Sequence, residues 1–347
     1  MIKGLVISSP SFFEYNMDFQ VLKKIIEDND SFLITTHVNP DADAIGSEIA
    51  LHIMLNKLGK KSYIINHSYT PYYLQFLDPE NIIKKFNPDT DRKYFDEADV
   101  LIGLDFNRLN RLVSMEKVFS ESKKIKVCID HHQDSEDFVS YSFDDDQYSA
   151  TGHIIYDFIK KTGIVKLDYD IAYPLYAAIM TDTGSFRFER TNAELHRIIA
   201  SLLDLGVDPV EVYDKIYDQS KLSKIQLLGR ALDSIKLVSD NRIGYMFLTR
   251  EDIIKYVASE SDTDGFVNYT LSIENVVLGM FFIELKNGFK VSFRSKGKIP
   301  VDKLAAKFGG GGHINAAGVR FRDLSMDKEM KNILETAEKF LINNYQE

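Results

Sequence analysis

His37-Val-Asn-Pro-Asp41-Ala-Asp43-Ala-Ile-Gly-Ser47 is the stretch of the chain that decides its fold. It follows a β-prone run, Phe32 to Thr36, and leads into a helical pattern from Ala44 to Leu58. The stretch is therefore expected at the carboxyl end of a strand, where open α/β sheets bind their ligands. Each polar side chain has a structural explanation by itself, since an aspartate can cap a helix. Three side chains that can bind a metal, so close in sequence, favour a metal site.

The first half of the chain alternates predicted strands with predicted helices. Further strands are expected at Lys61 to Ile65, Val100 to Leu104 and Ile125 to Ile129, and helices at Thr151 to Lys161 and Ile171 to Met180. Strands separated by helices are typical of a parallel, doubly wound sheet. The predicted fold class is α/β, with a doubly wound, mainly parallel sheet in the N-terminal domain.

The second half predicts a helical segment and then a smaller domain. The pattern from Asn192 to Val238 is almost wholly helical, with Asp208-Pro209 as a helix start. Beyond it, strands are expected at Arg242 to Leu248, Val276 to Leu285 and Phe289 to Arg294, followed by a closing helix from Asp327 to Asn344. We therefore expect a catalytic domain at residues 1–195, a helical linker at 196–240 and a mixed α/β domain at 241–347.

Acidic residues also follow the other predicted elements. Asp105 ends one apolar strand, Asp130-His131-His132 ends the next, and Asp182 follows an apolar helix. The carboxyl ends of parallel strands meet at one edge, so these side chains are expected near Asp41 and Asp43. A lone aspartate at a strand end is more often a turn residue. Four carboxylates in one site, however, resist joint ionisation, and two divalent cations would balance them.

Together with Gly309-Gly-Gly-Gly-His313 near the C-terminus, these motifs resemble the DHH superfamily of phosphoesterases. Their order and spacing match over nearly the whole chain. The layout, a DHH catalytic domain followed by a domain that carries a GGGH motif, is most similar to the bifunctional oligoribonuclease and pAp phosphatase type. The resemblance implies that the C-terminal, DHH-associated domain binds substrate.

The resemblance also implies a centre for two divalent cations, bridged by Asp105. The implied ligands are His37, Asp41 and Asp105 for one cation and Asp43, Asp105, His131 and Asp182 for the other. Oxygen and imidazole ligands without thiolate fit Mn²⁺, with Mg²⁺ as the alternative, and do not fit structural zinc. Asp130 would orient a histidine through a hydrogen bond, and His132 would contact the scissile phosphate or the leaving group.

The implied activity is hydrolysis of very short oligoribonucleotides to nucleoside 5′-monophosphates, and of pAp to AMP. Our hypothesis for the mechanism is that a water between the two cations loses a proton and attacks phosphorus in line, while the cations stabilise the developing charge. Short single-stranded RNA and small phosphorylated nucleotides are therefore the expected partners.

The glycine-rich segment is the candidate substrate clamp. Backbone without side chains can approach a phosphate and donate N–H groups to it, and a short helix is expected after the glycines. A flexible turn is the structural alternative. The resemblance implies substrate contacts from Arg294, Ser295, Gly310, Gly311, Gly312 and His313. Arg111 is a further candidate ranked above Arg187, and either arginine could instead form a surface ion pair.

Phe106 departs from the family pattern. It follows the bridging aspartate, where a small residue is expected, and so predicts a narrower pocket.

Composition describes an ordinary globular chain of 347 residues, 44% hydrophobic and 27% charged. The longest apolar run, Val276 to Ile283, is far shorter than the roughly 20 residues that span a bilayer. Met1-Ile-Lys leads into no signal-peptide segment, so we expect a cytoplasmic protein with no membrane partner.

The single cysteine, Cys128, excludes a disulfide framework. A net charge of −10 argues against long, sequence-independent contact with nucleic acid. By analogy with the family, a homodimer is expected.

Alternative functions remain open. One is a phosphodiesterase for cyclic or linear dinucleotide signals such as c-di-AMP and pApA. Another is a pyrophosphatase or exopolyphosphatase, although the Gly309 to His313 clamp counts against a pyrophosphatase. An inactive nucleotide-binding protein is the alternative outside enzymes, but an Asp or His stands at every expected ligand position.

Overall fold

The computed structural model describes residues 17–133 and 135–344. The prediction about Met1-Ile-Lys lies outside the described residues. The chain divides into two compact units, and the boundary falls between Gln219 and Ser220. This boundary lies within the segment 196–240 that was expected to link two domains. The predicted limits at residues 195 and 240 stay predictions.

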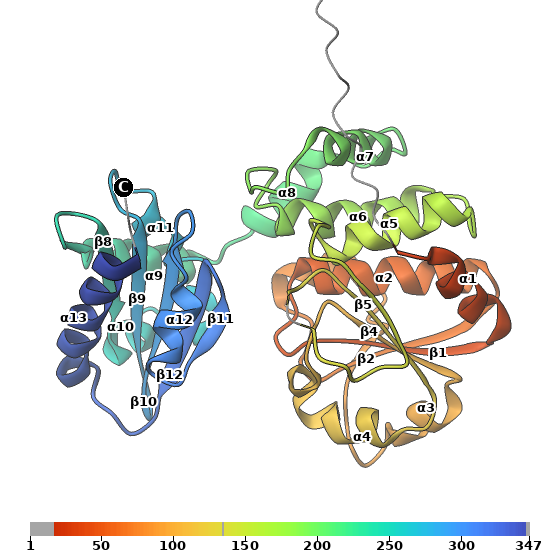
Figure 1. The fold of residues 1–347 in the computed structure, drawn as a ribbon, viewed down its shortest axis with the longest axis horizontal. Coiled ribbons are helices and arrows are strands. Elements are labelled where there is room, and N and C mark those ends of the chain that lie inside the picture. The colour runs from red at the N-terminus through yellow and green to blue at the C-terminus, as the bar shows by residue number, and fades with distance from the viewer. Residues whose placement is uncertain (1–16, 134, 345–347) are drawn as a thin grey trace, which may run out of the picture. The chain divides into compact units, whose positions relative to one another are not determined.

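A six-stranded parallel sheet forms the centre of the N-terminal unit (Figure 1). In the order β3-β2-β1-β4-β5-β6, it contains β1 (Ser31–Thr36), β2 (Lys61–Asn66), β3 (Ile83–Lys85), β4 (Val100–Leu104), β5 (Ile125–Asp130) and β6 (Tyr141–Asp144). All neighbouring strands pair in parallel, which confirms the predicted fold class. The edge strands β3 and β6 were not predicted, because both are short and largely exposed and so form no apolar run.

Helices cover both faces of this sheet, as a doubly wound fold requires (Figure 1). One face carries α1 (Phe19–Asp28), α2 (Ala42–Lys57), α5 (Thr151–Thr162) and α6 (Tyr169–Asp182), and the other carries α3 (Arg92–Glu97), α4 (Glu116–Glu121) and the 3-10 helix Leu109–Met115. The helices α7 (Ala193–Leu203) and α8 (Pro209–Tyr217) complete the unit. Phe32 and Ile34 of β1 pack toward the first layer, whereas Leu33 packs toward the second.

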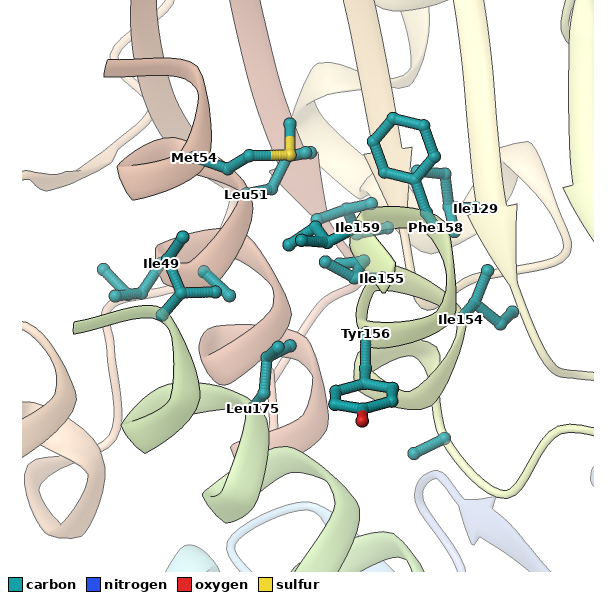
Figure 2. Close-up of a cluster of buried hydrophobic side chains, with 14 of the residues drawn as sticks. Ile49, Leu51, Met54, Ile129, Ile154, Ile155, Tyr156, Phe158, Ile159 and Leu175 are labelled. Atoms are coloured by element: carbon teal, nitrogen blue, oxygen red, sulfur yellow. The ribbon is translucent and has the colours of Figure 1, made fainter. Parts of the chain in front are cut away.

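Figure 2 shows part of the first layer. Met54 of α2, Ile155 of α5 and Leu175 of α6 are fully buried there, in the same hydrophobic cluster as Ile129 of β5. Burying one such side chain contributes roughly 1.5–3 kcal/mol. This packing holds the starts of α2 and α5 and the end of α6 in place, and those three points carry residues of the candidate site.

The C-terminal unit is built on a six-stranded mixed sheet. In the order β11-β12-β10-β9-β8-β7, it contains β7 (Lys236–Val238), β8 (Ile243–Leu248), β9 (Leu278–Leu285), β10 (Gly288–Ser295), β11 (Gly311–His313) and β12 (Ala316–Phe321). The helices of this unit are α9 (Leu222–Asp233), α10 (Arg250–Lys255), α11 (Asn268–Leu271), α12 (Val301–Ala306) and α13 (Met326–Asn344). Only β8 and β9 pair in parallel among these strands, so the predicted mixed α/β unit is confirmed.

Two predictions for this part of the chain are wrong. The helical pattern was expected to reach Val238, but β7 is a strand paired with β8. No helix follows the glycines, since β11 and β12 form an antiparallel pair there. A β-carbon on Gly312 would lie 2.4 Å from the Ala316 carbonyl oxygen, so the glycine is needed for this close approach. Pairing between distant segments, which local sequence does not reveal, decides both cases.

Candidate metal centre and substrate site

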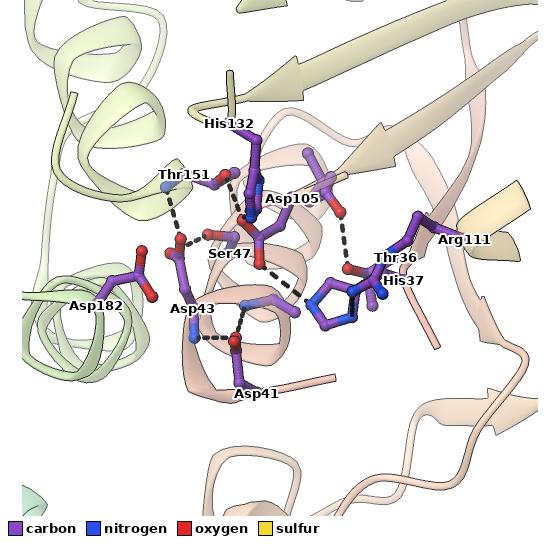
Figure 3. A network of polar contacts seen from close by, with 12 residues as sticks. Thr36, His37, Asp41, Asp43, Ser47, Asp105, Arg111, His132, Thr151 and Asp182 are labelled. Carbon is purple, nitrogen blue, oxygen red and sulfur yellow. Dashed lines mark hydrogen bonds and ion pairs between the residues drawn. The ribbon is translucent and has the colours of Figure 1, made fainter. Parts of the chain in front are cut away.

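The carboxyl edge of the parallel sheet gathers the polar side chains that the sequence singled out (Figure 3). His37 follows β1, Asp105 follows β4, and His131 follows β5. Asp43 lies in the first turn of α2, and Asp182 is the last residue of α6. The structure thus brings together all six side chains predicted as metal ligands, in groups that could each hold an ion.

The first group joins His37, Asp41 and Asp105. The His37 Nε2 atom lies 3.4 Å from Asp105 Oδ2, and both side chains are buried. Asp41 also caps α2, since its Oδ1 accepts hydrogen bonds from the backbone N–H groups of Asp43 and Ala44, both at 3.1 Å. The structural explanation for Asp41 is therefore correct as well. A carboxylate has two oxygens, so capping does not prevent it from binding an ion.

The second group joins Asp43, His131 and Asp182. The His131 Nε2 atom lies 3.0 Å from Asp182 Oδ2 and 3.7 Å from Asp43 Oδ2. It also lies 3.5 Å from Asp105 Oδ1. Asp105 therefore presents one oxygen to each group, which is the arrangement of a bridging carboxylate.

Asp105 adopts an unusual backbone conformation, with φ of 63°. Aspartate and asparagine tolerate this left-handed region better than most residues. The side chain is also held by Thr151, whose hydroxyl donates a hydrogen bond to Asp105 Oδ1 at 3.1 Å. This conformation turns the carboxylate away from the strand and into the centre.

The start of α5 is a part of the site that the sequence reasoning missed. The backbone N–H groups of Thr151 and Gly152 donate to the two carboxylate oxygens of Asp43, at 2.7 and 2.9 Å. The Ser47 hydroxyl adds a third hydrogen bond at 3.2 Å. The first N–H groups of a helix favour a negative charge, so α5 stabilises the Asp43 carboxylate. Only the packing of α5 against α2 reveals this contact.

Two glycines allow the helices of the centre to approach one another. A β-carbon on Gly46 of α2 would lie 2.4 Å from the carbonyl oxygen of Pro174 in α6. A β-carbon on Gly152 would lie 2.6 Å from the Ala178 β-carbon. Larger residues would separate α2, α5 and α6, and with them Asp43 and Asp182.

The centre perturbs the pKa values of its histidines and carboxylates. Burial lowers the pKa of His37, but the hydrogen bond and charge of Asp105 outweigh it and raise the pKa to about 9. The same balance raises the pKa of His131. Burial raises the pKa of Asp105, but its bonds to both histidines hold it well below its usual range. Desolvation and the Asp105 charge raise the pKa of Asp41 to about 6.

This electrostatic pattern fits divalent cations. Without a metal, protons on the histidines balance the negative charge of the carboxylates, and a divalent cation can replace those protons. The donors are carboxylate oxygens and imidazole nitrogens, which suit Mn²⁺ or Mg²⁺. Of the described residues, buried His131 and Asp130 each retain a side-chain atom, Nδ1 and Oδ2, without a hydrogen-bond partner. The residues present therefore fit a metal centre.

His132 and Arg111 lie at the border of the centre (Figure 3). The His132 Nδ1 atom lies 2.7 Å from Asp130 Oδ1, the orienting contact that was expected, and 3.7 Å from Asp105 Oδ1. The exposed Arg111 brings Nη2 to within 3.2 Å of His37 Nδ1. Arg187 instead donates to the Gly184 carbonyl oxygen. Both His132 and Arg111 can therefore reach a molecule bound at the metals.

Phe106 does not narrow the site, contrary to the expectation from its size. Its ring is buried in the core on the α3 and α4 face, where it stacks on Phe138 with the ring centres 5.6 Å apart. The ring also covers Gly103 of β4, so the missing side chain at that position makes room for it.

A buried Glu48–Asn66 pair supports the strand ends that carry His37 and Asp105. Asn66 donates to Glu48 Oε2 at 2.8 Å and accepts a hydrogen bond from the backbone N–H of Thr36 at 3.2 Å. The Thr36 hydroxyl in turn donates to the Leu104 carbonyl oxygen at 2.7 Å. These bonds link α2, β2, β1 and β4 directly before the candidate ligands His37 and Asp105, although neither Glu48 nor Asn66 stood out in the sequence.

Glu48→Gln is expected to stabilise the metal-free protein at alkaline pH. Burial raises the pKa of Glu48 to about 8, so its ionisation opposes folding. The stability present below its ordinary pKa of 4.5 is lost as pH rises through about 8, and a neutral amide removes that loss. Urea unfolding in EDTA should show a gain of about 4 kcal/mol at pH 8 and almost none at pH 4.5. A gain independent of pH, or one matched by the exposed control Glu116→Gln, would contradict this.

The candidate clamp residues in the C-terminal unit differ in their surroundings. Arg294 lies on β10 opposite Ala316 of β12, and its Nη1 donates to the Phe293 carbonyl oxygen. The Ser295 hydroxyl is buried and donates to the Ile299 carbonyl oxygen at 2.6 Å, so it holds the following loop. The structure places the predicted glycines around strand β11, with Gly311 and Gly312 exposed and His313 as its last residue.

Comparison with known proteins agrees with these features. The model of the DHH family, N-terminal domain, matches residues 31–179, and the DHHA1 domain model matches residues 245–343. The bifunctional oligoribonuclease and PAP phosphatase NrnA of Thermus thermophilus is 31% identical over 89% of both chains. The Bacillus subtilis protein of the same name is 26% identical over 83% of this chain and 88% of its own.

A solved structure extends the similarity to three dimensions. An exopolyphosphatase-related protein from Bacteroides fragilis superposes with a TM-score of 0.89 and 33% sequence identity, covering 93% of this chain and 97% of that one. The chain therefore belongs to the DHH family of metal-dependent phosphoesterases, and it carries the family's N-terminal domain together with a DHHA1 domain.

Proposed function

We propose that this phosphoesterase hydrolyses very short oligoribonucleotides to nucleoside 5′-monophosphates and converts pAp to AMP. The observation that carries the proposal is the position of Asp105, which presents one carboxylate oxygen to each of two ligand groups. Two relatives that match over most of their length are named as oligoribonucleases and PAP phosphatases. Two Mn²⁺ ions are the proposed cofactors, with Mg²⁺ as the alternative.

Bound divalent cations supply Lewis acidity and positive charge at the phosphate. His37, Asp41 and Asp105 would hold one ion, and Asp43, Asp105, His131 and Asp182 the other. His132 can donate a proton or hydrogen bond to the phosphate or the leaving group, because Asp130 orients its ring. Arg111 adds positive charge next to His37. In the C-terminal unit, Arg294 and the backbone of the glycines are the proposed contacts to substrate.

The expected cellular location and oligomeric state stay predictions. None of the described helices is long and apolar enough to span a membrane. A cytoplasmic location and a homodimer are inferences from sequence only.

The proposed function is tested by chromatography of reaction products. The purified protein is incubated with Mn²⁺ and, in separate reactions, pApA, pAp, c-di-AMP and pyrophosphate. Conversion of pApA and pAp to AMP is the expected result. Turnover of pyrophosphate alone, or of c-di-AMP but not pAp, would overturn the proposal and indicate one of the alternative activities.

Arg294→Ala is expected to raise KM for pApA while kcat changes little, because Arg294 is assigned to binding rather than to chemistry. Loss of a charge-assisted hydrogen bond costs about 1.5–3 kcal/mol, which corresponds to a KM roughly 10- to 100-fold higher. Arg294→Lys should recover only part of the loss, since lysine lacks the two-pronged geometry of arginine. Steady-state kinetics check this, with Arg320→Ala on the adjacent strand as the control. An unchanged KM would contradict the assignment.

A further inference from the structure

An apolar hollow lies beside the end of α6 in the N-terminal unit. Its volume is about 300 Å³. Its lining comes from α6, from the turn that follows α6 and from α8, and comprises Tyr176, Met180, Ser185, Phe186, Pro209, Val210, Tyr213 and Asp214. Aromatic and aliphatic side chains make up most of this lining. No metal ligand is part of it.

The α8 helix leaves an apolar stripe exposed at this hollow. Val210, Tyr213 and Tyr217 follow one another at helical spacing and are 64%, 42% and 39% exposed. The rings of Tyr213 and Tyr217 lie 4.8 Å apart. A helix in a globular protein normally buries such a stripe against its own core. The stripe is therefore available to a ligand with flat, apolar faces.

Two residues of the hollow flank the candidate ligand Asp182 in the sequence. Met180 stands two positions before Asp182, and Ser185 stands three positions after it. The turn between them has three successive left-handed residues, Gly184, Ser185 and Phe186, with φ between 57° and 64°. This conformation costs roughly 1–3 kcal/mol at each non-glycine position and is typical of functional sites.

The strained turn places one side chain in the hollow while it ends the helix that carries Asp182. The Ser185 N–H donates to the Met180 carbonyl oxygen at 2.8 Å, and the Phe186 N–H donates to the Thr183 hydroxyl at 3.2 Å. Phe186 then lies edge-on to Tyr176, with ring centres 6.2 Å apart. The position of Phe186 is therefore coupled to the position of the ligand Asp182.

The chemistry of the lining selects the class of ligand. Besides the hydroxyls of Tyr176 and Tyr213, the polar groups of the hollow are the Ser185 hydroxyl and the Asp214 carboxylate, and no lysine or arginine is among its lining residues. A phosphate does not suit such a surface, because the carboxylate would repel it. A nucleobase does, since bases stack on aromatic rings and exocyclic amino groups donate to carboxylates.

We propose that this hollow binds a nucleobase of the substrate whose scissile phosphate lies at the metal centre, and that it prefers bases with an amino group. Tyr213 supplies a stacking surface, and Asp214 accepts a hydrogen bond from the amino group. The proposal rests on the proposed function, because it requires an oligonucleotide substrate. Adenine, cytosine and guanine carry such an amino group, whereas uracil does not.

The test compares Tyr213→Ala and Asp214→Ala with the wild type. The substrates are pApA, pUpU and two abasic analogues of pApA, each of which lacks one of the two bases. Loss of stacking in Tyr213→Ala should lower kcat/KM for pApA about 10-fold. For at least one abasic analogue, kcat/KM of this variant should equal that of the wild type. Asp214→Ala should remove most of the preference for pApA over pUpU. The control Tyr141→Ala changes an exposed tyrosine on β6, outside the hollow, and should have no effect.

The outcomes separate this inference from the proposed function. Wild-type rates for pApA in both hollow variants would overturn the inference while leaving the function intact. A change in molecular mass of Tyr213→Ala in sedimentation would mark the stripe as a protein interface and would also overturn it. If the wild type cleaves no oligonucleotide, the proposed function fails, and calorimetric binding of AMP then decides the inference: equal affinities of wild type and Tyr213→Ala would reject it.

Discussion

Asp105→Asn is expected to lower kcat/KM for pApA by about a thousandfold or more, because the amide cannot balance the charge of two cations or bridge them as a carboxylate does. Asn is the suitable replacement, since it tolerates the left-handed backbone of position 105 (φ 63°) and has the same shape. It can still accept the hydrogen bond from Thr151. The loss should therefore come from chemistry and metal binding rather than from misfolding.

A matched control is available in the same unit. Asp157 of α5 is also a buried carboxylate, bonded to the Tyr148 hydroxyl at 3.0 Å and to Lys161 at 2.7 Å, but it lies outside the ligand groups. Asp157→Asn should keep kcat/KM within about threefold of the wild type, even if it lowers the melting temperature. Circular dichroism should show both variants folded. Substantial Mn²⁺-dependent turnover by Asp105→Asn would refute the bridging role.

The sequence predicts the centre of the fold better than its margins. The buried strands β1, β4 and β5 are apolar runs, and each is followed by a polar residue of the metal centre, so local sequence identifies both. The strands β3, β6, β7 and β11 are short and form the edges of the two sheets, where partly exposed side chains leave no such signal. Their existence depends on a partner strand rather than on their own sequence.

The residues of the candidate site also differ in how readily the sequence predicts them. His37 and Asp41 are predicted from a short segment with several side chains that can bind a metal, and Asp105 is predicted because it ends an apolar strand. Thr151 and Glu48 do not, because threonine at a helix start and glutamate within a helix are common in any protein. Their roles arise only when α5 and β2 are packed beside α2. Residues that orient the candidate ligands are thus harder to predict than the candidate ligands themselves.

Mn²⁺ is expected to raise the melting temperature of the N-terminal unit by at least about 5 °C over the protein in EDTA, and by more at pH 8.5 than at pH 5.5. Saturation of one site at 100 times its Kd contributes about 2.7 kcal/mol, and 1 kcal/mol corresponds to roughly 2–4 °C in a domain of this size. The cations replace protons that the centre holds in their absence. Their effect must therefore depend on pH.

The direction of this pH dependence follows from the pKa shifts of the metal-free centre. The pKa of Asp41 is raised from 3.8 to about 6, so the stability it contributes below pH 3.8 is lost as pH rises through 6. The pKa of His37 is raised from 6.5 to about 9, so its contribution is lost as pH rises through 9. Asp105, whose pKa is lowered, changes only below its ordinary value of 3.8, outside this range.

Both contributions weaken the metal-free protein between pH 5.5 and 8.5, while the metal-bound protein, with ionised carboxylates and neutral histidines, needs no protons. The difference between the two melting curves should consequently widen with pH. Thermal unfolding at the two pH values, each with EDTA and with Mn²⁺, measures it, and Asp105→Asn should lose most of the shift at both. A shift that is larger at pH 5.5 would mean that the histidines and carboxylates at this edge of the sheet do not hold the ions.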